Sequence, residues 1–350
     1  MVSQDSYPPT NMFAAQQHLL VERLHHLLAM LPPILRTDII SSLERNGKLL
    51  YQPETDANPL NPTLPAGTWS LLTLLVAQYI SPDIDLMYVS NVAVAIECFV
   101  CALDLLDDVE DEDQTEIVQA LGVARVLNVS TTLLMLAQRA IISLTEQEIP
   151  APLILHLLDT LQASALVATA GQHRDLLAEH RLANDLTREE CIEIAAAKAG
   201  AIMRLACQLG ASCAGADDKL CNQFSELGEL LGIAHQLDND SHDLYYLLQD
   251  ETPAIIPGER VETRKSVKTD LVRGKKTLPV VLAAKIIAPL GKTLESSEEE
   301  HRQYLQALHE GIVTTWGISL LYRERARSCL QEIEAQRPVT PALRFLLGFG

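Results

Sequence analysis

The sequence has few aromatic residues and few basic ones. Phe, Trp and Tyr make up 4% of its 350 residues, and 27 Lys and Arg stand against 46 Asp and Glu. The formal charge of −19 argues against nucleic-acid binding, because contacts to a phosphate backbone need Lys and Arg. Apolar residues account for 48%, mostly Leu and Ala, and few segments are rich in β-branched residues. This composition favours helices over sheets.

No cysteine pattern indicates a disulfide framework or a zinc site. Seven Cys are scattered, and the single C-x-x-C, Cys98 with Cys101, lies in an apolar run without a second Cys or His pair. We therefore expect reduced thiols and a cytoplasmic protein. Residues 1–10 lack the basic and apolar regions of a signal peptide. The longest apolar runs, such as 69–80, are too short and interrupted to cross a bilayer, so we expect no transmembrane segment.

Helical periodicity covers most of the chain. The expected helices span roughly 14–30, 36–46, 68–79, 84–109, 114–127, 130–145, 151–178, 187–213, 217–248, 268–289, 297–313 and 316–334. Residues 1–12 are expected to form a disordered N-terminus and residues 13–350 a single domain, because no linker separates two composition regimes. The predicted fold class is all-α: one bundle of ten or more helices around a central cavity.

The first group of acidic residues ends a strongly apolar helix at residues 87–106. Asp104, Asp107, Asp108 and Asp111 share one face of this helix. Since like charges repel and the preceding face is apolar, we expect these carboxylates to point inward and to need neutralisation. Divalent cations that prefer oxygen ligands would supply it; the alternative is a helix that frays into an acidic surface loop. Asp104, one turn earlier, is either a further metal ligand or an acid at the helix end.

A second acidic group follows the apolar run 224–234. Asn239, Asp240 and Asp243 again share one helix face. Two apolar helices with inward carboxylates can face each other across a bundle and hold metal ions with a polyanionic ligand. Mg²⁺ uses one or two carboxylates plus substrate phosphates. The two acidic groups therefore predict a diphosphate bound through several Mg²⁺ ions.

Basic residues concentrate in one segment, residues 264–276, which opens an apolar helix. Lys and Arg at a helix start suit a phosphate, which makes Lys265 and Lys275 candidate phosphate ligands. A solvated basic loop is the alternative. Lys198 is a further cation inside an apolar helix, and it is either a phosphate ligand or a surface lysine whose stem covers apolar area.

Taken in order, these motifs resemble the trans-polyprenyl (isoprenyl) diphosphate synthase family. Residues 107–111 resemble its first motif, D-D-x-x-D, and residues 236–243 its second, Q-x-x-D-D-x-x-D, with Asn239 in place of an Asp. Shorter matches are residues 171–176 to G-Q-x-x-D-L, 198–200 to K-T-G, 269–271 to S-D-L and 274–279 to G-K-x-T-L-P. The resemblance extends from about residue 45 to 335. It implies an all-α isoprenoid-synthase fold, bound Mg²⁺ and a homodimer.

The resemblance also implies roles for individual residues. The metal ligands would be Asp107, Asp108, Asp111, Asn239, Asp240 and Asp243, and the diphosphate ligands Lys198, Gln236, Lys265 and Lys275. The catalytic set would comprise Asp107, Asp108, Asp111, Asp240, Lys198 and Lys275. Phe99, Ala102 and Leu103 would line the chain pocket, with room for a prenyl chain of C15–C20 or longer.

The sequence departs from the family pattern in the groups that bind the second diphosphate substrate of the family, isopentenyl diphosphate. The R-R-G-x-P-T stretch that normally follows the first motif is absent, with no arginine before Arg125. The N-terminal G-G-K-R-x-R-P loop is reduced to residues 46–53 with Lys48 as its remaining cation, and Val100 replaces a histidine. In the family these groups bind isopentenyl diphosphate. Losing charge-assisted phosphate contacts at about 1.5–3 kcal/mol each would cripple that pocket.

We therefore expect Mg²⁺-dependent ionisation of an allylic prenyl diphosphate with loss of pyrophosphate, followed by cyclisation or elimination as in a class I terpene synthase. One alternative is prenyl transfer, either chain elongation or transfer to a peptide or other acceptor. Another is a non-catalytic regulatory subunit of a prenyl synthase. Asp238 either compensates for Asn239 or points away from it, and His242 is either a base or a solvent-facing residue.

Overall fold

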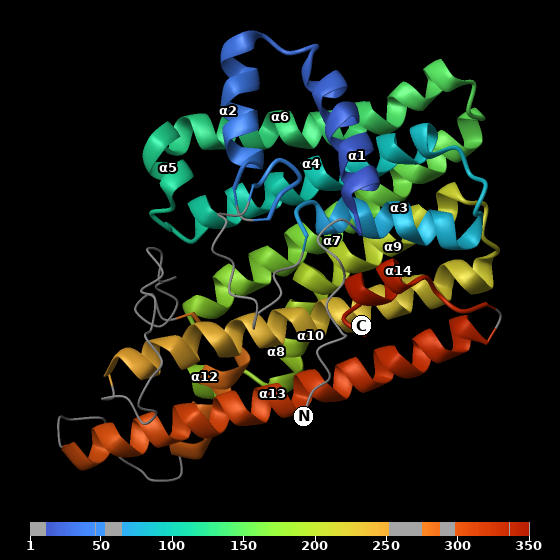
Figure 1. The fold of residues 1–350 in the computed structure, drawn as a ribbon. Helices are drawn as coiled ribbons and strands as arrows, with labels where there is room; N and C mark the ends of the chain where they lie inside the picture. The colour runs from blue at the N-terminus through green and yellow to red at the C-terminus, as the bar shows by residue number, and fades with distance from the viewer. Residues whose placement is uncertain are drawn as a thin grey trace. The chain divides into compact units, whose positions relative to one another are not determined.

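The computed structural model describes residues 12–45, 47–52, 65–251, 275–287, 298–335 and 337–349. Within these ranges every regular element is a helix and there is no strand (Figure 1). The all-α prediction is therefore confirmed. The predicted disordered segment 1–12 lies outside the described residues except for Met12.

The helices follow one another with short connections where the chain is described. The α-helices are α1 (Ala14–Leu28), α2 (Pro33–Leu43), α3 (Thr68–Ile80), α4 (Leu86–Glu110), α5 (Glu116–Leu121), α6 (Val123–Ile142), α7 (Ala151–Glu179), α8 (Arg188–Ala195), α9 (Ala201–Cys213), α10 (Asp218–Glu251), α12 (Leu278–Ile287), α13 (Glu298–Glu334) and α14 (Pro341–Leu346). Two 3₁₀ helices, η1 (Ser143–Gln147) and η2 (Ala183–Asp185), and a π segment, η3 (Ala196–Gly200), complete them.

Helix boundaries depart from the prediction at Pro, Gly and Thr. Pro33 occupies the first turn of α2, where its missing N–H removes no helical hydrogen bond, so α2 begins before the predicted residue 36. Gly122 has φ 75° and separates α5 from α6, earlier than the predicted break near residues 128–129. α13 is continuous through another predicted break, and there the Thr315 hydroxyl bonds to the Gly311 carbonyl at 2.8 Å within the helix.

The described contacts group the chain into two compact units. The first unit comprises residues 1–164, 203–228 and 329–350, and the second comprises residues 165–202 and 229–328. The single domain proposed for residues 13–350 stays a prediction.

α4 is the central helix of the first unit and packs against α1, α3 and α6. The Asp85 carboxylate caps its N-terminus by accepting a hydrogen bond from the Met87 N–H at 2.9 Å. Every residue from Tyr88 to Ala102 is buried. A helix that is apolar on all sides packs inside the protein, so α4 supplies much of the core of this unit and carries the first acidic group at its end.

Three helices are long and apolar enough to cross a membrane when judged by length and composition alone: Leu86–Glu110, Val123–Gln147 and Ala151–Glu179. The prediction that no apolar run reaches this length was therefore wrong, because a continuous helix joins apolar runs that polar residues interrupt in the sequence. The apolar window of Leu86–Glu110 is 83% buried inside the protein. Its side chains therefore serve the core of the first unit.

In the second unit, small residues let neighbouring backbones approach η3 closely. A Cβ on Gly171 of α7 would lie 2.6 Å from Ala197 Cβ, and one on Gly232 of α10 would lie 2.4 Å from the Ala199 carbonyl oxygen. Atoms never pack at such distances, so only glycine fits at either position. These two approaches bring α7 and α10 against the segment that carries Lys198.

Gly232→Ala should therefore lower the free energy of unfolding by about 1–3 kcal/mol, because the added methyl meets backbone atoms of Ala199 and Gly200. Gly317→Ala in α13 is the matched control, since an added Cβ there meets nothing within 4 Å. We expect this control to be neutral or stabilising by about 0.5–1 kcal/mol. Urea unfolding measures both. A Gly232→Ala protein as stable as wild type would show that the close approach is not required.

Candidate active site

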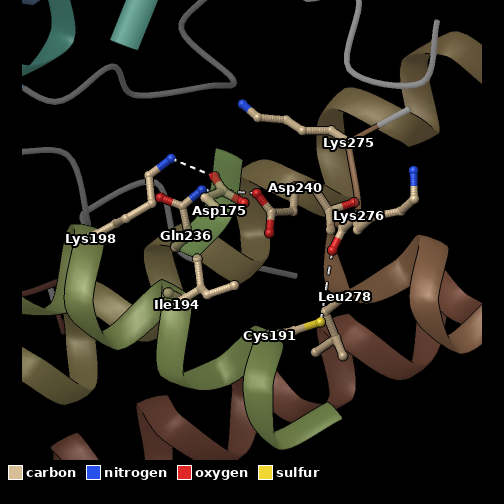
Figure 2. A pocket seen from close by; sticks show the side chains of 11 residues that line it. Asp175, Cys191, Ile194, Lys198, Gln236, Asp240, Lys275, Lys276 and Leu278 are labelled. Atoms are coloured by element: carbon tan, nitrogen blue, oxygen red, sulfur yellow. Dashed lines mark hydrogen bonds and ion pairs between the residues drawn. The ribbon is translucent and has the colours of Figure 1, made fainter. Parts of the chain in front are cut away.

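Lysines, carboxylates and a glutamine meet in one pocket of the second unit (Figure 2). Its lining residues are Asp175, Cys191, Ile194, Ala195, Lys198, Gln236, Asp240, Lys275, Lys276, Thr277 and Leu278. They come from α7, α8, η3, α10, the segment 275–277 and the first residue of α12. The pocket thus brings together four residues that the sequence predicted for a diphosphate site: Lys198, Gln236, Asp240 and Lys275.

Lys198 lies where the helix widens into the π segment η3, a distortion that is frequent at functional sites. Its Nζ donates to Asp175 Oδ2 at 2.7 Å, and both side chains are only 16% exposed. Breaking a partly buried pair of this kind leaves a charge poorly compensated, so the ammonium group is held in one direction. Lys198 is therefore a pocket residue and not a surface lysine.

Asp240 and Gln236 stand one turn apart on α10, and Gln236 Nε2 donates to Asp240 Oδ1 at 2.9 Å. Burial raises the pKa of Asp240 to about 7 in spite of this hydrogen bond. The Asp175 carboxylate adds to the rise, whereas Lys198 and Lys275 oppose it. The ionised carboxylate is thus incompletely stabilised, and its surroundings favour an additional cation beside it.

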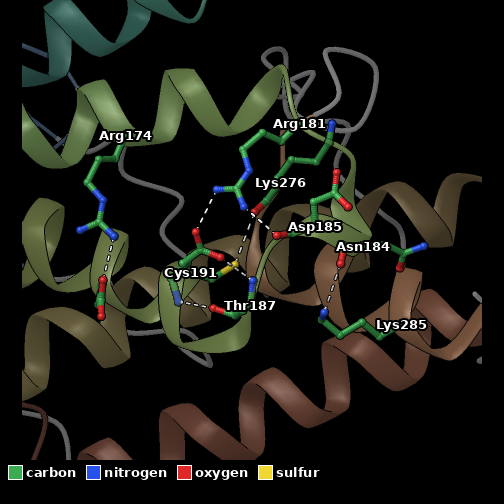
Figure 3. Close-up of polar contacts among 10 residues, drawn as sticks. Arg174, Arg181, Asn184, Asp185, Thr187, Cys191, Lys276 and Lys285 are labelled. Carbon is green, nitrogen blue, oxygen red and sulfur yellow. Dashed lines mark hydrogen bonds and ion pairs between the residues drawn. The ribbon is translucent and has the colours of Figure 1, made fainter.

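Polar contacts fix the chain between α7 and α8 (Figure 3). Arg181 donates to Glu190 Oε1 at 2.9 Å and to the Asp185 carbonyl at 2.6 Å. Lys285 of α12 donates to the Asn184 carbonyl at 3.4 Å. These bonds tie the connection and η2 to α8 and α12, the helices that form one wall of the pocket.

Lys275 and Lys276 immediately precede α12, and both line the pocket. The Cys191 thiol of α8 donates to the Lys276 carbonyl, with Sγ and O 3.8 Å apart (Figure 3). Burial raises the pKa of Cys191 to about 12, so it remains a thiol and is suited to this contact and not to nucleophilic attack. The contact holds the backbone of the basic residues against α8.

The first acidic group lies in the first unit, where α4 ends. Asp108 and Asp111 are buried and Asp107 is half-buried, as expected for carboxylates that point into the protein. The Thr115 hydroxyl donates to Asp108 Oδ2 at 3.1 Å. The alternative of a frayed acidic surface loop does not hold for these residues.

The chain turns back directly after α4 through backbone hydrogen bonds. The Glu112 N–H bonds to the Val109 carbonyl at 3.1 Å, and the Asp113 N–H bonds to the Asp108 carbonyl at 2.8 Å. This is a Schellman helix end, with Glu112 at the left-handed position (φ 55°) that glycine usually takes. The turn folds Asp113 back so that it is buried.

Lys48, the cation left in the N-terminal loop, forms an ion pair with Asp104. The Lys48 side chain is 8% exposed and that of Asp104 is 51% exposed. Nearby, the fully buried Glu97 accepts hydrogen bonds from the Leu49 N–H at 2.7 Å and the Ser70 hydroxyl at 3.0 Å. Burial raises the pKa of Glu97, although Lys48 and the two donors act in the opposite direction. Glu97 thereby fixes the loop that carries Lys48.

The residues whose roles the sequence left open have partners of their own in the second unit. Asp238 forms an ion pair with Arg323 of α13, so it ties α10 to α13. His242 is exposed, and its ring lies 5.7 Å from that of Trp316. Asn239 is exposed.

The remaining predicted site residues are Asp243, Lys265, Phe99, Ala102 and Leu103. Asp243 is half-buried on α10, and Lys265 lies outside the described residues. Phe99 and Ala102 are buried in the core of the first unit, and Leu103 is half-buried. Their role in chain length stays a prediction.

Whether the predicted metal ligands suit Mg²⁺ depends on how proteins bind this ion. Among the described residues no group of three or more His, Cys, Asp or Glu side chains is arranged to hold a metal ion. Mg²⁺, however, binds through one or two carboxylates and completes its shell with water and substrate phosphates. The raised pKa of Asp240 agrees with a cation beside it. Asp240, which shares its pocket with three lysines, therefore fits a metal held jointly with a phosphate ligand, and the other metal ligands stay predictions.

Asp175 is the functional residue that sequence reasoning missed. The sequence marks it only as part of the motif at residues 171–176. Its partner, Lys198, is 23 residues away on another element, so no helical periodicity reveals the pair. Cys191 also lines the pocket without a sequence signal, and the sequence marks Thr277 only as part of the motif at residues 274–279.

A family model described as "Polyprenyl synthetase" matches residues 68–310. "Tryptophan prenyltransferase ComQ" of Bacillus spizizenii is 31% identical over 183 residues, covering 52% of this chain and 57% of that protein. "Geranylgeranyl diphosphate synthase" of Mycobacterium tuberculosis is 31% identical over 184 residues, covering 51% of this chain and 47% of that protein. The chain thus spans about half the length of the curated relatives it matches.

Solved structures resemble the whole fold. A polyprenyl synthetase from Streptomyces coelicolor A3(2) has a TM-score of 0.69 at 21% identity, with 95% of this chain and 98% of that chain covered. A polyprenyl synthase from Caulobacter crescentus CB15, complexed with calcium and isoprenyl diphosphate, has a TM-score of 0.65 at 21% identity, with 95% and 96% covered. The predicted all-α isoprenoid-synthase fold is therefore confirmed.

The buried Glu97 predicts a pH dependence of stability. Because its pKa is raised above the ordinary 4.5, the folded protein keeps this proton at pH values where the unfolded chain has released it. The Glu97 contribution to the free energy of unfolding should therefore fall as pH rises above 4.5, by at most about 1.4 kcal/mol per pH unit.

Urea unfolding of wild type and Glu97→Gln between about pH 4 and pH 8 isolates this contribution. We expect the stability of wild type relative to the variant to decrease with rising pH. A difference that is constant, or that grows with pH, would contradict the raised pKa.

Proposed function

Because the chain belongs to the polyprenyl synthetase family, we propose that it is a prenyltransferase. In this proposal it ionises an allylic prenyl diphosphate of C15–C20 or longer and passes the prenyl group to an acceptor. The proposal extends to the cytoplasmic location and the homodimer expected from the sequence. Sedimentation of the purified protein tests the dimer.

The pocket in the second unit is the observation that carries the proposal. Three lysines, Lys198, Lys275 and Lys276, line it together with Gln236 and Asp240. Lysine is a strong phosphate ligand, and a carboxylate in the same pocket suits a metal-bound phosphate better than a bare one. Few ligands other than a metal diphosphate satisfy both kinds of group at once.

The lysines would act on the leaving group. As the C–O bond of the substrate breaks, negative charge accumulates on pyrophosphate, and preorganised cations stabilise that charge more than they stabilise the ground state. Asp175 holds Lys198 in place, so its ammonium group needs little reorganisation. Gln236 holds the Asp240 carboxylate in a fixed orientation.

Mg²⁺, when bound, would neutralise the diphosphate and lower the barrier to its departure. Its proposed ligands are Asp107, Asp108, Asp111, Asp240 and Asp243, with the side-chain carbonyl of Asn239. Three ions are proposed. Nothing in the described residues builds a metal cage that would bind the ion without substrate.

Transfer to an acceptor is favoured over the cyclisation expected from the sequence. The relatives are named as a prenyltransferase and as diphosphate synthases, and each of these names describes joining a prenyl group to a second molecule. A regulatory subunit is disfavoured because it would need neither the paired Lys198 nor the carboxylate beside it.

Lys198→Met should lower kcat/KM for pyrophosphate release about 10²–10³-fold, the usual effect of removing one preorganised charge-stabilising group. The assay uses Mg²⁺ with geranyl, farnesyl or geranylgeranyl diphosphate, and product analysis identifies the preferred chain length. Lys219→Met, at an exposed lysine of the first unit, is the control and should keep wild-type activity. A Lys198→Met enzyme as active as wild type would contradict the proposed role, and a wild-type protein that releases no pyrophosphate would contradict the function.

A further inference from the structure

A second cavity is formed within the first unit alone. Its volume is about 240 Å³, and residues of α1, α2 and the chain directly after α2 line it. The lining residues are Val21, His25, Ile40, Glu44, Leu49, Leu50, Tyr51 and Gln52. None of them belongs to the pocket that carries Lys198, and none of the acids at the end of α4 lines this cavity. It is therefore a different site from the diphosphate pocket.

Several contacts fix the segment that closes this cavity. The Tyr51 N–H bonds to the Lys48 carbonyl at 2.8 Å, and the Leu49 N–H donates to Glu97 Oε1 at 2.7 Å. The Leu49 side chain is 4% exposed, and it packs so closely on Gly67 that a Cβ there would lie 2.6 Å from Leu49 Cδ1. The cavity is thus preformed, so a ligand needs to order little of the chain when it binds.

Apolar side chains form most of the cavity wall. Val21, Ile40, Leu49 and Leu50 are aliphatic, and the ring of Tyr51, which is 37% exposed, adds aromatic surface. Such a wall is stabilised when the apolar body of a ligand covers it. The volume of 240 Å³ corresponds to about eight water molecules at ~30 Å³ each. A small organic molecule, such as one benzene ring on a short chain, fits this space.

The charge at the edge of the cavity is negative. Of the described residues that line it, Glu44 is the acidic one and none is Lys or Arg. Within the described part of the chain the Glu44 carboxylate has no hydrogen-bond or ion-pair partner, because the neighbouring Arg45 pairs with Glu116. Glu44 is also the residue at which α2 ends, and the C-terminal end of a helix dipole is negative. Both features attract a cation and repel an anion.

An organic cation suits this cavity better than a metal ion. Among the described residues no group of three or more His, Cys, Asp or Glu side chains is arranged to hold a metal, and the cavity offers only Glu44 and His25. A bare ion would also leave the apolar wall uncovered. An ammonium group on an apolar body uses both features, because the charge lies beside Glu44 and the body lies against the wall. Gln52 at the edge can accept a further hydrogen bond.

We propose that this cavity of the first unit binds a small organic amine, in which an ammonium group is attached to an apolar aromatic or branched body. The ammonium group pairs with Glu44, and the Tyr51 ring and the aliphatic wall cover the body. This inference does not rest on the proposed prenyl transfer, because the cavity and the diphosphate pocket share no residue. Binding of the amine to the folded protein also raises its thermal stability by mass action.

Fluorine NMR of the full-length protein labelled with fluorotyrosine tests the inference at the cavity itself. The chain has 8 Tyr, and Tyr51→Phe identifies the signal of Tyr51. Three probes share a benzene ring and differ in charge: phenethylammonium, phenethyl alcohol and phenylacetate. The cation should shift the Tyr51 signal saturably, the alcohol should shift it only at higher concentration, and the anion should not shift it. Absence of a saturable shift with the cation, or an equal shift with the anion, overturns the inference.

Two variants locate the binding site. Glu44→Gln should weaken the binding of phenethylammonium about three- to fivefold, the upper range for an exposed ion pair. The matched control, Glu22→Gln, removes the same charge from α1 at a residue that pairs with His18 and does not line the cavity, so it should leave the affinity unchanged. Leu50→Trp fills the cavity and should abolish binding. Thermal unfolding verifies that each variant is folded.

Unchanged affinity in Glu44→Gln, an equal loss in Glu22→Gln, or wild-type affinity in a folded Leu50→Trp protein would each overturn the inference. None of these measurements uses a prenyl diphosphate, so their outcome is independent of the proposed function.

Discussion

Burying a carboxylate without a hydrogen-bond donor or an opposite charge costs several kcal/mol, and this chain buries carboxylates in its first unit and partly buries others in its second. Glu97 is satisfied by a backbone N–H and a hydroxyl, and the bonds fix a loop against two helices. Asp175 is satisfied by Lys198, and that pair fixes the pocket. Asp240 accepts a hydrogen bond from Gln236, and burial still raises its pKa to about 7. The same requirement therefore shapes the scaffold where it is met and creates a cation-binding environment where it is not.

Close backbone packing provides the second constraint, because the polar pocket needs rigid walls. Gly171 and Gly232 let α7 and α10 approach η3 to distances that no other residue permits. The π segment itself changes the direction in which Lys198 projects relative to a regular helix. The helix distortion and the small residues occur together: Lys198 stands in the π segment, and Gly171 and Gly232 let α7 and α10 pack directly against that segment.

The sequence predicted the features that depend on local patterns, but it did not predict pairs of residues that are distant in the chain. The shared face of Asp107, Asp108 and Asp111 follows from helical periodicity, and their burial follows from the apolar helix before them, so both were predictable. The pairs Lys48–Asp104, Asp175–Lys198 and Asp238–Arg323 join residues 56, 23 and 85 positions apart. Only the tertiary fold brings them together. The length of the apolar stretches was underestimated, because single polar residues that interrupt an apolar run do not interrupt a helix.

In the turn after α4, backbone groups determine the path of the chain and side chains determine the charge. Two backbone hydrogen bonds close it, from the N–H groups of Glu112 and Asp113, and its left-handed residue is not even a glycine. Its path is consequently independent of the side chains it displays. Evolution can replace basic residues by acidic ones at this turn, or the reverse, without rebuilding the helix that precedes it. The charge of this turn can therefore change by substitution while the backbone path that carries it stays the same.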